Sequence, residues 1–280
     1  MDKVLASKKK SSLVKSLEKL PSLMVAFSGG VDSTFLLAVA SETLGNRVIA
    51  VTANSGVQPF TDREMAAAFT RERSIKHIVF ESDEKSIPEF IANSPDRCYH
   101  CKKALCIKLR QIAEEKGIPH IAHAINTDDL GDYRPGIKAA EEMGLIAPLV
   151  DAGLGKEEIR HLSKEMGLAT WDKPSMACLA SRIPYGTPIT EEKISMIGRA
   201  EKILADEGFR QYRVRHHGTV ARIEVNENEI SRLAGTELRE KIVSGLKDIG
   251  FKHIALDLEG FRSGNMNRDI ELPAEKIDEP

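Results

Sequence analysis

The sequence predicts an α/β fold, in which a parallel sheet carries helices on both faces and a small C-terminal α+β domain follows. Apolar stretches of strand length alternate with helical patterns over the first 170 residues, and short polar turns link them. Such alternation is typical of parallel strands, which need a crossover connection that usually contains a helix. After Thr170 the alternation gives way to an irregular stretch and then to paired strands between helices.

The first 170 residues supply the elements of the predicted sheet and the helices that cover it. Buried strands are expected where short apolar runs stand between turn residues, at 24–27, 47–53, 77–80, 120–125 and 145–150. Helices are expected where apolar residues recur every three or four positions, at 11–20, 34–45, 61–73, 99–116, 137–143 and 156–166, with a short helix or loop at 87–94. Thr61 and Glu64 form a capping box at the start of one of these helices. Residues 1–10 are polar and are expected to be a solvated lead-in to the first helix.

The remainder of the chain predicts a loop that carries chemistry and a small domain. Residues 171–190 contain three prolines and no periodicity, so an ordered irregular loop is expected there. Helices at 191–207 and 229–249, strands at 212–216 and 220–225 around His217-Gly218, and a strand at 253–258 follow. The predicted division is therefore a domain at 1–170, the loop at 171–190, a small α+β domain at 191–270 and a polar tail at 271–280.

The stretch from Met24 to Ser33 has the chemistry of a phosphate-binding loop. A buried strand runs directly into Ser28-Gly-Gly-Val-Asp-Ser33, and an apolar helical segment follows. Glycines let the backbone approach a ligand closely, and the free N–H groups at a helix start point at an anion. Asp32 would repel a phosphate unless a divalent cation lies between them, so the stretch predicts a phosphate site that uses Mg²⁺. The Gly-Lys-Ser/Thr ending of the Walker motif is absent from the sequence.

Composition excludes several classes of protein. A hydrophobic content of 41% and a charged content of 29% are those of a soluble globular protein. The formal net charge of −2 gives no basic excess that would indicate nucleic acid as a partner. No apolar stretch approaches the length of a membrane span, and no apolar stretch follows a charged N-terminus as in a signal peptide, so a cytoplasmic protein is expected.

Three of the four cysteines are candidates for a metal centre. Cys98 and Cys101 stand three apart at the predicted start of a helix, where the helix dipole favours thiolate, and Cys178 lies in the irregular loop. Three thiolates with no evident fourth ligand suit a [4Fe–4S] cluster with one open iron, whereas a structural zinc would need His100 or Cys106 as well. A redox pair of Cys98 and Cys101 beside an incidental Cys178 is the alternative. Cys106 follows the helical pattern and is expected to be a buried apolar residue.

The loop at 28–33 resembles the SGGxDS signature of the PP-loop ATP pyrophosphatases, whose fold is adenine nucleotide α-hydrolase-like. The resemblance implies that the ATP ligands are Ser28, Gly29, Gly30, Asp32 and Ser33. It also implies that Asp32 holds Mg²⁺, and that a substrate is adenylated with loss of pyrophosphate before a nucleophile displaces AMP. Asp129, beyond the fourth predicted strand, is a further candidate for contact with ATP or metal.

Four more motifs resemble the LarE-type sulfur transferases and together span nearly the whole chain. They are residues 171–187 with Cys178 and Ser181-Arg-Ile-Pro-Tyr-Gly186, and the segments 132–136, 212–215 and 260–264. This family converts both carboxylates of a pyridinium-3,5-dicarboxylate mononucleotide to thiocarboxylates, a step towards the nickel-pincer nucleotide cofactor of lactate racemase. In one form of the family, the cysteine matching Cys178 gives up its own sulfur and becomes dehydroalanine. In the other, three cysteines hold a [4Fe–4S] cluster whose open iron carries an added sulfide, and Cys98 and Cys101 indicate this second form.

Two arginines of the small domain are candidate anion ligands. Arg213 and Arg215 alternate along a strand, so both point to one face and match a nucleotide phosphate or the substrate's second carboxylate; a solvated strand face is the alternative. The catalytic set that the resemblance implies is Cys178, Asp32, Arg213 and Arg215, and the substrate ligands are Glu201, Arg213, Arg215, Arg262 and Arg182.

The expected partners are the pyridinium nucleotide and a sulfide donor, with neither membrane nor nucleic acid. The family resemblance further implies a homo-oligomer, with the hexamer as the form that the family suggests. Three other functions compete with this prediction. An RNA-thiolating PP-loop enzyme should show a basic surface, an amidotransferase-like ligase would leave Cys98 and Cys101 without a task, and a non-catalytic nucleotide sensor would not turn over ATP.

Overall fold

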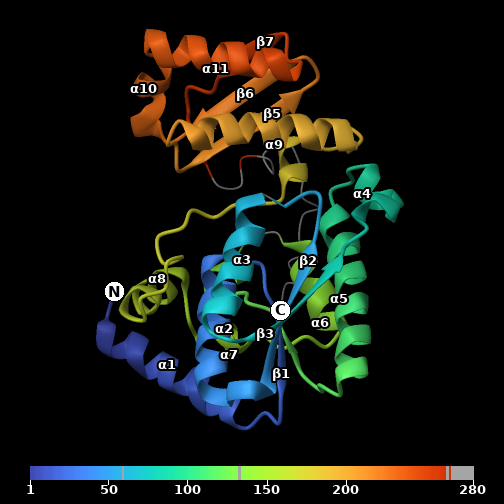
Figure 1. Ribbon diagram of the computed structural model, residues 1–280, viewed down its shortest axis with the longest axis vertical. Helices are drawn as coiled ribbons and strands as arrows, with labels where there is room; N and C mark the ends of the chain where they lie inside the picture. Colours follow the sequence, from blue (N-terminus) through green and yellow to red (C-terminus); the bar gives the residue numbers. More distant parts are fainter. Residues whose placement is uncertain (59, 132–133, 263–264, 266–280) are drawn as a thin grey trace, which may run out of the picture. The chain divides into compact units, whose positions relative to one another are not determined.

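The computed structural model describes residues 1–58, 60–131, 134–262 and 265. It divides into two compact units, the first formed by 1–92 and 96–178 and the second by 93–95 and 179–280. Figure 1 shows the helices and strands of each unit. None of the helices in the described ranges is both long enough and apolar enough to cross a membrane.

The first unit is built on a four-stranded sheet. Its strands are β1 (Leu23–Ala26), β2 (Val48–Asn54), β3 (Lys76–Glu81) and β4 (Ile121–Ala122), and they lie in the order β3-β2-β1-β4. All pairings are parallel, with Val25 of β1 opposite Ala50 of β2 and Ala122 of β4. The predicted α/β class with a parallel sheet is confirmed.

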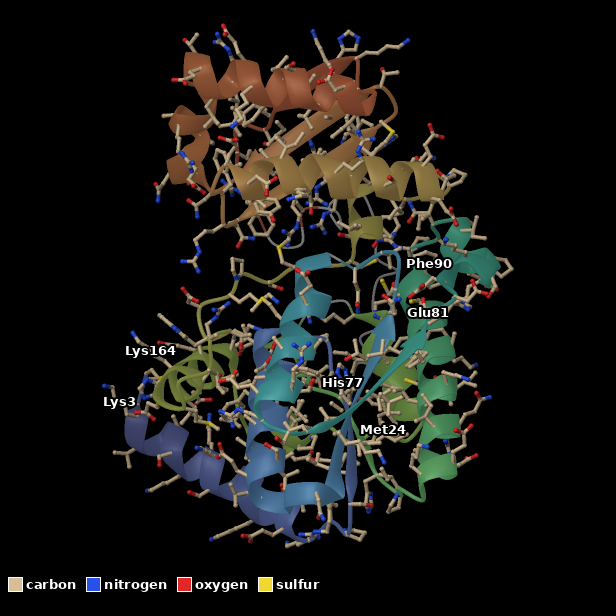
Figure 2. The ribbon with its side chains drawn as sticks, viewed as in Figure 1. Lys3, Met24, His77, Glu81, Phe90 and Lys164 are labelled. Carbon is tan, nitrogen blue, oxygen red and sulfur yellow. The ribbon has the colours of Figure 1, made fainter. Side chains whose placement is uncertain are left out.

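Helices bury both faces of this sheet. They are α1 (Lys3–Glu18), α2 (Val31–Leu44), α3 (Phe60–Glu72), α4 (Pro88–Ile91), α5 (Arg97–Lys116), α6 (Pro135–Glu142), α7 (Pro148–Asp151) and α8 (Lys156–Glu165). Successive strand residues face opposite ways, so Leu23 and Val25 join the core under α1, α2 and α8. Met24, which Figure 2 labels, joins the core under α5 and α6. A sheet buried on both faces needs the near-continuous apolar strands that the sequence has.

Two predictions for the first unit are wrong in detail. The first helix begins at Lys3 rather than Ser11, because the Asp2 carboxylate caps it by accepting from the N–H groups of Val4 and Leu5. The strand expected at 145–150 is reduced to a single bridge between Ile146 and Ala122. Pro148 then begins the short helix α7, since its fixed φ suits the first helical position.

In its described residues, the second unit combines three strands and three α-helices. The strands β5 (Tyr212–His217), β6 (Val220–Val225) and β7 (His253–Leu256) lie in the order β5-β6-β7, with β5–β6 antiparallel and β6–β7 parallel. The helices are α9 (Glu191–Asp206), α10 (Ile230–Ala234) and α11 (Thr236–Ile249), and they enclose one apolar core with the sheet. The single helix expected at 229–249 is wrong, because Gly235 takes an extended conformation and separates α10 from α11.

Some predictions fall outside the described residues. They concern the polar tail at 271–280, the side chain of Thr61 in the capping box, and parts of two family motifs at 132–133 and 263–264.

Candidate active site

The loop between β1 and α2 has the conformation that its sequence predicts. The Phe27 N–H donates to the Val51 carbonyl at 2.8 Å, which extends the sheet to the edge of the loop. Gly29 has a φ of +72°, a conformation that favours glycine. Gly30 is the N-cap of the 14-residue helix α2 and caps it with no side chain, so the N–H groups of the first turn remain available to an anion.

Two hydroxyls converge on this loop. Ser28 Oγ and Ser33 Oγ lie 3.1 Å apart, the Gly30 N–H donates to Ser28 Oγ at 3.4 Å, and Ser33 Oγ donates to the Gly30 carbonyl at 3.2 Å. A Cβ on Gly30 would stand 3.4 Å from Ser28 Oγ and would crowd the mouth of the loop. The loop therefore presents backbone N–H groups and two hydroxyls to one region, as phosphate binding requires.

Two lysines that the sequence did not indicate hold the loop from outside. Lys156, the first residue of α8, forms an ion pair with Asp32, and Lys173 Nζ donates to the Gly29 carbonyl at 2.9 Å. Both stand more than 120 residues from the loop in the sequence, so no local pattern could reveal them. The second oxygen of Asp32, Oδ1, is buried and has no hydrogen-bond partner within the described residues. A buried carboxylate oxygen that lacks a donor fits a ligand for Mg²⁺.

A cavity of about 230 Å³ opens beside the loop at the carboxyl edge of the sheet. One wall contains the polar loop residues Ser28, Gly30, Asp32 and Ser33. Aliphatic side chains from the strands and from α5 form much of the remaining wall, and they are Val51, Ala53, Leu105, Leu109 and Ile125. A polar end beside an apolar chamber suits a nucleotide, whose phosphates are charged and whose base is flat and weakly polar.

Lys102 and His123 also line this cavity, and the sequence analysis missed both. Burial lowers the pKa of the His123 imidazole to about 4, and the positive charge of Lys102 adds to this effect. Burial also lowers the pKa of Lys102. His123 follows β4 directly, so its position at the carboxyl end of a strand was the available signal.

Asp129 takes part in local contacts beyond β4. Its Oδ2 accepts from the Asn126 N–H at 3.0 Å, and its Oδ1 pairs with Arg134 at 2.6 Å. Both oxygens thus have partners in this structure, and contact with ATP or metal stays a prediction.

The structure brings the three candidate cysteines into electrostatic range of one another. Cys98 and Cys101 lie in the first turns of α5, and Cys178 ends the irregular segment that follows α8. Burial, helped by the neighbouring Cys178, Glu84 and Cys98, raises the pKa of the Cys101 thiol to about 12. The thiolate that the helix start was expected to favour is therefore disfavoured at Cys101 while no metal is bound. Cys106 is fully buried in the core under α5, which confirms its predicted apolar role.

Within the described ranges, no three His, Cys, Asp or Glu side chains converge on a point at which one metal ion could be held. The alternative of a structural zinc site completed by His100 is therefore not preformed, and His100 instead contacts Asp96 at 3.0 Å. The thiolates of a [4Fe–4S] cluster each bind a different iron, so they are more widely spaced than the ligands of one ion. Three soft sulfur donors from two segments, one of them too buried to ionise unaided, fit such a cluster.

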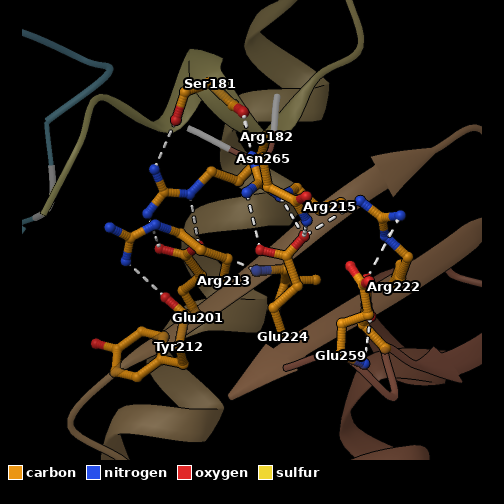
Figure 3. A network of polar contacts seen from close by, with 12 residues as sticks. Ser181, Arg182, Glu201, Tyr212, Arg213, Arg215, Arg222, Glu224, Glu259 and Asn265 are labelled. Atoms are coloured by element: carbon orange, nitrogen blue, oxygen red, sulfur yellow. Dashed lines mark hydrogen bonds and ion pairs between the residues drawn. The ribbon is translucent and has the colours of Figure 1, made fainter. Parts of the chain in front are cut away.

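In the second unit, Arg182 and Glu201 bind each other. Arg182 is fully buried and donates through Nε and Nη2 to the two carboxylate oxygens of Glu201, at 2.7 and 3.0 Å (Figure 3). Glu201 also accepts from the Val214 N–H at 3.1 Å, which joins α9 to β5. These two predicted substrate ligands thus have a structural task, and direct contact with a substrate stays a prediction.

Arg215 makes a second buried pair, with Glu224 of the neighbouring strand. Its Nε and Nη2 donate to Glu224 at 2.9 and 2.8 Å, and its Nη1 donates to the Ser181 carbonyl at 2.8 Å (Figure 3). Arg213 lies over the ring of Phe261 at 4.8 Å. Arg262 is exposed.

Positive charge exceeds negative charge in this network. Burial and the nearby Arg182 and Arg215 together lower the pKa of Arg213 to about 10, against the opposing effect of Glu201 and Glu224. Among the described residues, three buried arginines thus share two buried glutamates. An anionic group would relieve this excess.

Comparison with known proteins yields several relatives that cover most of the chain. A pyridinium-3,5-bisthiocarboxylic acid mononucleotide synthase of Lactiplantibacillus plantarum is 38% identical over 262 residues, which are 92% of this chain and 94% of the relative. An uncharacterised protein of Synechocystis is 40% identical over 89% of this chain and 93% of its own. A glutamine-hydrolysing GMP synthase polypeptide of Thermoplasma acidophilum is 27% identical over 65% of this chain and 63% of its own. No family model matches the chain.

Proposed function

The chain belongs to the LarE-type sulfur transferases, and from this membership we propose that it uses ATP to convert the carboxylates of a pyridinium-3,5-dicarboxylate mononucleotide to thiocarboxylates. The product would serve synthesis of a nickel-pincer cofactor. One observation carries the proposal: the loop at 28–33 opens into a cavity that helix α5 lines, and α5 begins with Cys98 and Cys101. A site for ATP and a site for sulfur thus share one helix.

The first proposed step is adenylation. A substrate carboxylate oxygen attacks the α-phosphorus of ATP, a new P–O bond forms, and the bond to the β-phosphate breaks so that pyrophosphate leaves with the electron pair. The N–H groups at the start of α2 and the hydroxyls of Ser28 and Ser33 would donate to the departing pyrophosphate, where negative charge grows. Mg²⁺ held in part by Asp32 would neutralise the phosphates. Lys156 pairs with Asp32 in this structure. Its ammonium would neutralise the negative charge of the phosphates that Mg²⁺ does not balance.

The second proposed step is sulfur transfer. A sulfur nucleophile attacks the acyl carbon, a C–S bond forms, and the C–O bond to the phosphate breaks with release of AMP. A [4Fe–4S] cluster bound by Cys98, Cys101 and Cys178 would supply this sulfur in a soft, deprotonated form. The role of the chain would be to hold the three thiolates, two at the start of α5, which also lines the cavity, and one in the segment that follows α8.

The arginines of the second unit would bind the substrate. Arg213 and Arg215 lie in a buried network with more arginines than glutamates, so a phosphate or a second carboxylate would complete its charge. The pairs of Arg182 with Glu201 and of Arg215 with Glu224 would keep the guanidinium groups in place.

An anaerobic turnover assay tests the proposal. The full chain is incubated with the pyridinium dicarboxylate mononucleotide, Mg²⁺-ATP and sulfide, and AMP, pyrophosphate and the thiocarboxylate are quantified by mass spectrometry. We expect all three products in equal amounts per carboxylate. Release of AMP without any sulfur in the product would contradict the sulfur step, and thiolation of tRNA in place of the nucleotide would favour the RNA-modifying alternative.

The same assay identifies the sulfur donor, through the number of turnovers and the mass of the chain after the reaction. Many turnovers with sulfide and an intact Cys178 support the cluster. A single turnover, after which the chain has lost the mass of one H₂S at Cys178, would show that this cysteine is sacrificed. The oligomeric state stays a prediction, which sedimentation of the full chain measures.

A further inference from the structure

Two cavity residues, Lys102 and His123, have no role in the steps above. Lys102 lies in the second turn of α5, and His123 follows β4. Both line the cavity together with Ser28 and Gly30 of the phosphate-binding loop.

Among the described residues, Lys102 is a cation without a counter-ion. No carboxylate in the described part of the chain forms an ion pair or hydrogen bond with it, although the structure has many such pairs elsewhere, including Lys156 with Asp32. A half-buried ammonium without a partner loses hydration and gains no Coulomb energy in return. Such a group is favourable only where a ligand brings the missing negative charge.

His123 offers an unused hydrogen-bonding atom to the same cavity. Its side chain is 3% exposed, and its Nε2 is buried with no hydrogen-bond partner among the described residues. Buried polar side-chain atoms usually have a partner, so an unpaired nitrogen in a cavity wall indicates a ligand. The imidazole is neutral at pH 7, because burial and the charge of Lys102 disfavour a second cation.

We propose that Lys102 and His123 form the subsite for the α-phosphate of ATP and, once pyrophosphate has left, for the phosphate of the acyl-adenylate. This inference rests on the proposed function and adds catalytic residues to it. Lys102 would bind one non-bridging oxygen as a cation, and His123 would donate a neutral N–H to the other. Neither residue transfers a proton.

The assignment to the α-phosphate follows from position. The start of α2, with Lys156 and Lys173 beside it, already supplies the cationic surroundings that a pyrophosphate needs. Lys102 comes from a different helix and directly follows Cys101, a predicted sulfur-centre ligand. The α-phosphate links the pyrophosphate to the carbon that receives sulfur, so its subsite must lie between the loop and the cysteines.

Binding measurements with fragments of ATP test this assignment. Affinities of the full chain for adenosine, AMP and Mg²⁺-pyrophosphate are measured by calorimetry for the wild type, Lys102→Met and Lys103→Met. Lys103 is the matched control, because it is exposed and lies over the ring of Tyr99 on the same helix. We expect Lys102→Met to weaken AMP binding about 10- to 100-fold, the range for one charge-assisted hydrogen bond. Adenosine and pyrophosphate affinities should be unchanged.

The outcomes separate this inference from the proposed function. The α-phosphate assignment is refuted if Lys102→Met loses affinity for pyrophosphate but not for AMP. It is also refuted if Lys102→Met binds all three ligands as tightly as the wild type. Failure of the wild type to bind any adenine nucleotide would overturn the proposed function as well. A melting temperature equal to that of Lys103→Met shows that the variant is folded.

His123 gives an independent readout. His123→Leu should weaken AMP binding about tenfold, and His123→Gln, which keeps a neutral N–H, should restore part of the loss. The affinity of the wild type for the methyl ester of AMP, whose phosphodiester carries one charge throughout this range, should not change between pH 6 and 8, because the imidazole stays neutral. An affinity that rises as pH falls through this range would show a charged imidazole and contradict the proposed geometry.

Discussion

Substitution of Glu224 by Gln tests whether the buried arginine network stabilises the second unit. Glu224 is fully buried and accepts two hydrogen bonds from Arg215 and one from Arg222, at 2.9, 2.8 and 3.1 Å. Glutamine removes the negative charge and replaces one acceptor by an NH₂ group that faces a guanidinium. Because both members of the Arg215–Glu224 pair are at most 10% exposed, solvent screens little of this loss. We expect a destabilisation of about 3–5 kcal/mol, the usual cost of breaking a buried pair from one side.

Urea unfolding of the full chain, followed by a probe in the second unit, measures this effect. Glu229→Gln is the matched control, since Glu229 also pairs with an arginine, Arg232, but both side chains are partly exposed. The control should lose no more than about 0.5 kcal/mol. A loss below about 1 kcal/mol for Glu224→Gln would refute the reasoning, because it would mean that Arg215 is satisfied without its carboxylate. The double variant with Arg215→Met should recover much of the loss, since the most buried guanidinium that loses its carboxylate is then removed, while Arg222 keeps its pair with Asp257.

Three further predictions concern the first unit. In anaerobic preparations, Cys98→Ser or Cys101→Ser should remove bound iron and the brown absorbance near roughly 400 nm, whereas Cys106→Ser should keep both; iron retained in the first two would contradict the cluster. In the metal-free protein, iodoacetamide should modify exposed Cys98 well before Cys101 at pH 8, since a pKa of about 12 keeps Cys101 a thiol there. The alkylation rate of Cys101, measured by peptide mapping, should rise with pH until the pH reaches this pKa. Equal alkylation rates of Cys98 and Cys101 at pH 8 would refute the raised pKa of Cys101. Asp32→Asn should abolish the gain in ATP affinity that Mg²⁺ gives, measured by calorimetry, and a gain that persists would show that another group holds the ion.

The fold and the loop could be predicted from sequence because their determinants are local. Apolar periodicity marks each strand and helix within a few residues, and the phosphate-binding loop is a contiguous stretch whose glycine, hydroxyl and carboxylate positions are read directly. The predicted elements were wrong where contacts distant in the sequence, rather than the local pattern, determine the conformation. Residues 145–150 are apolar enough for a strand, but Pro148 starts a helical turn, and only Ile146 reaches the sheet.

The remaining site residues could not be read from a local pattern. Lys156 and Lys173 reach the loop from more than 120 residues away, and nothing in their neighbourhood differs from a surface lysine. Arg182 and Glu201 were expected as substrate ligands because the resemblance implies it, while the structure adds that they bind each other. This ion pair forms because the loop that carries Arg182 packs against α9, which carries Glu201. The periodicity of apolar residues gives no information about such a contact.

Helix α5 explains how a site for ATP and a site for sulfur can act together. Cys98, Cys101 and Lys102 stand at positions i, i+3 and i+4, and Leu105 and Leu109 continue the same face along the cavity wall. Cys106 and Leu109 anchor the helix in the core against the sheet. Cys98 and Cys101 therefore cannot move independently of the cavity wall, because the same helix carries both cysteines and part of the wall. If Cys98 and Cys101 hold the sulfur centre and Lys102 holds a phosphate, as we propose, a rotation of α5 would turn all three side chains away together, so the geometry of one helix would couple adenylation to sulfur transfer.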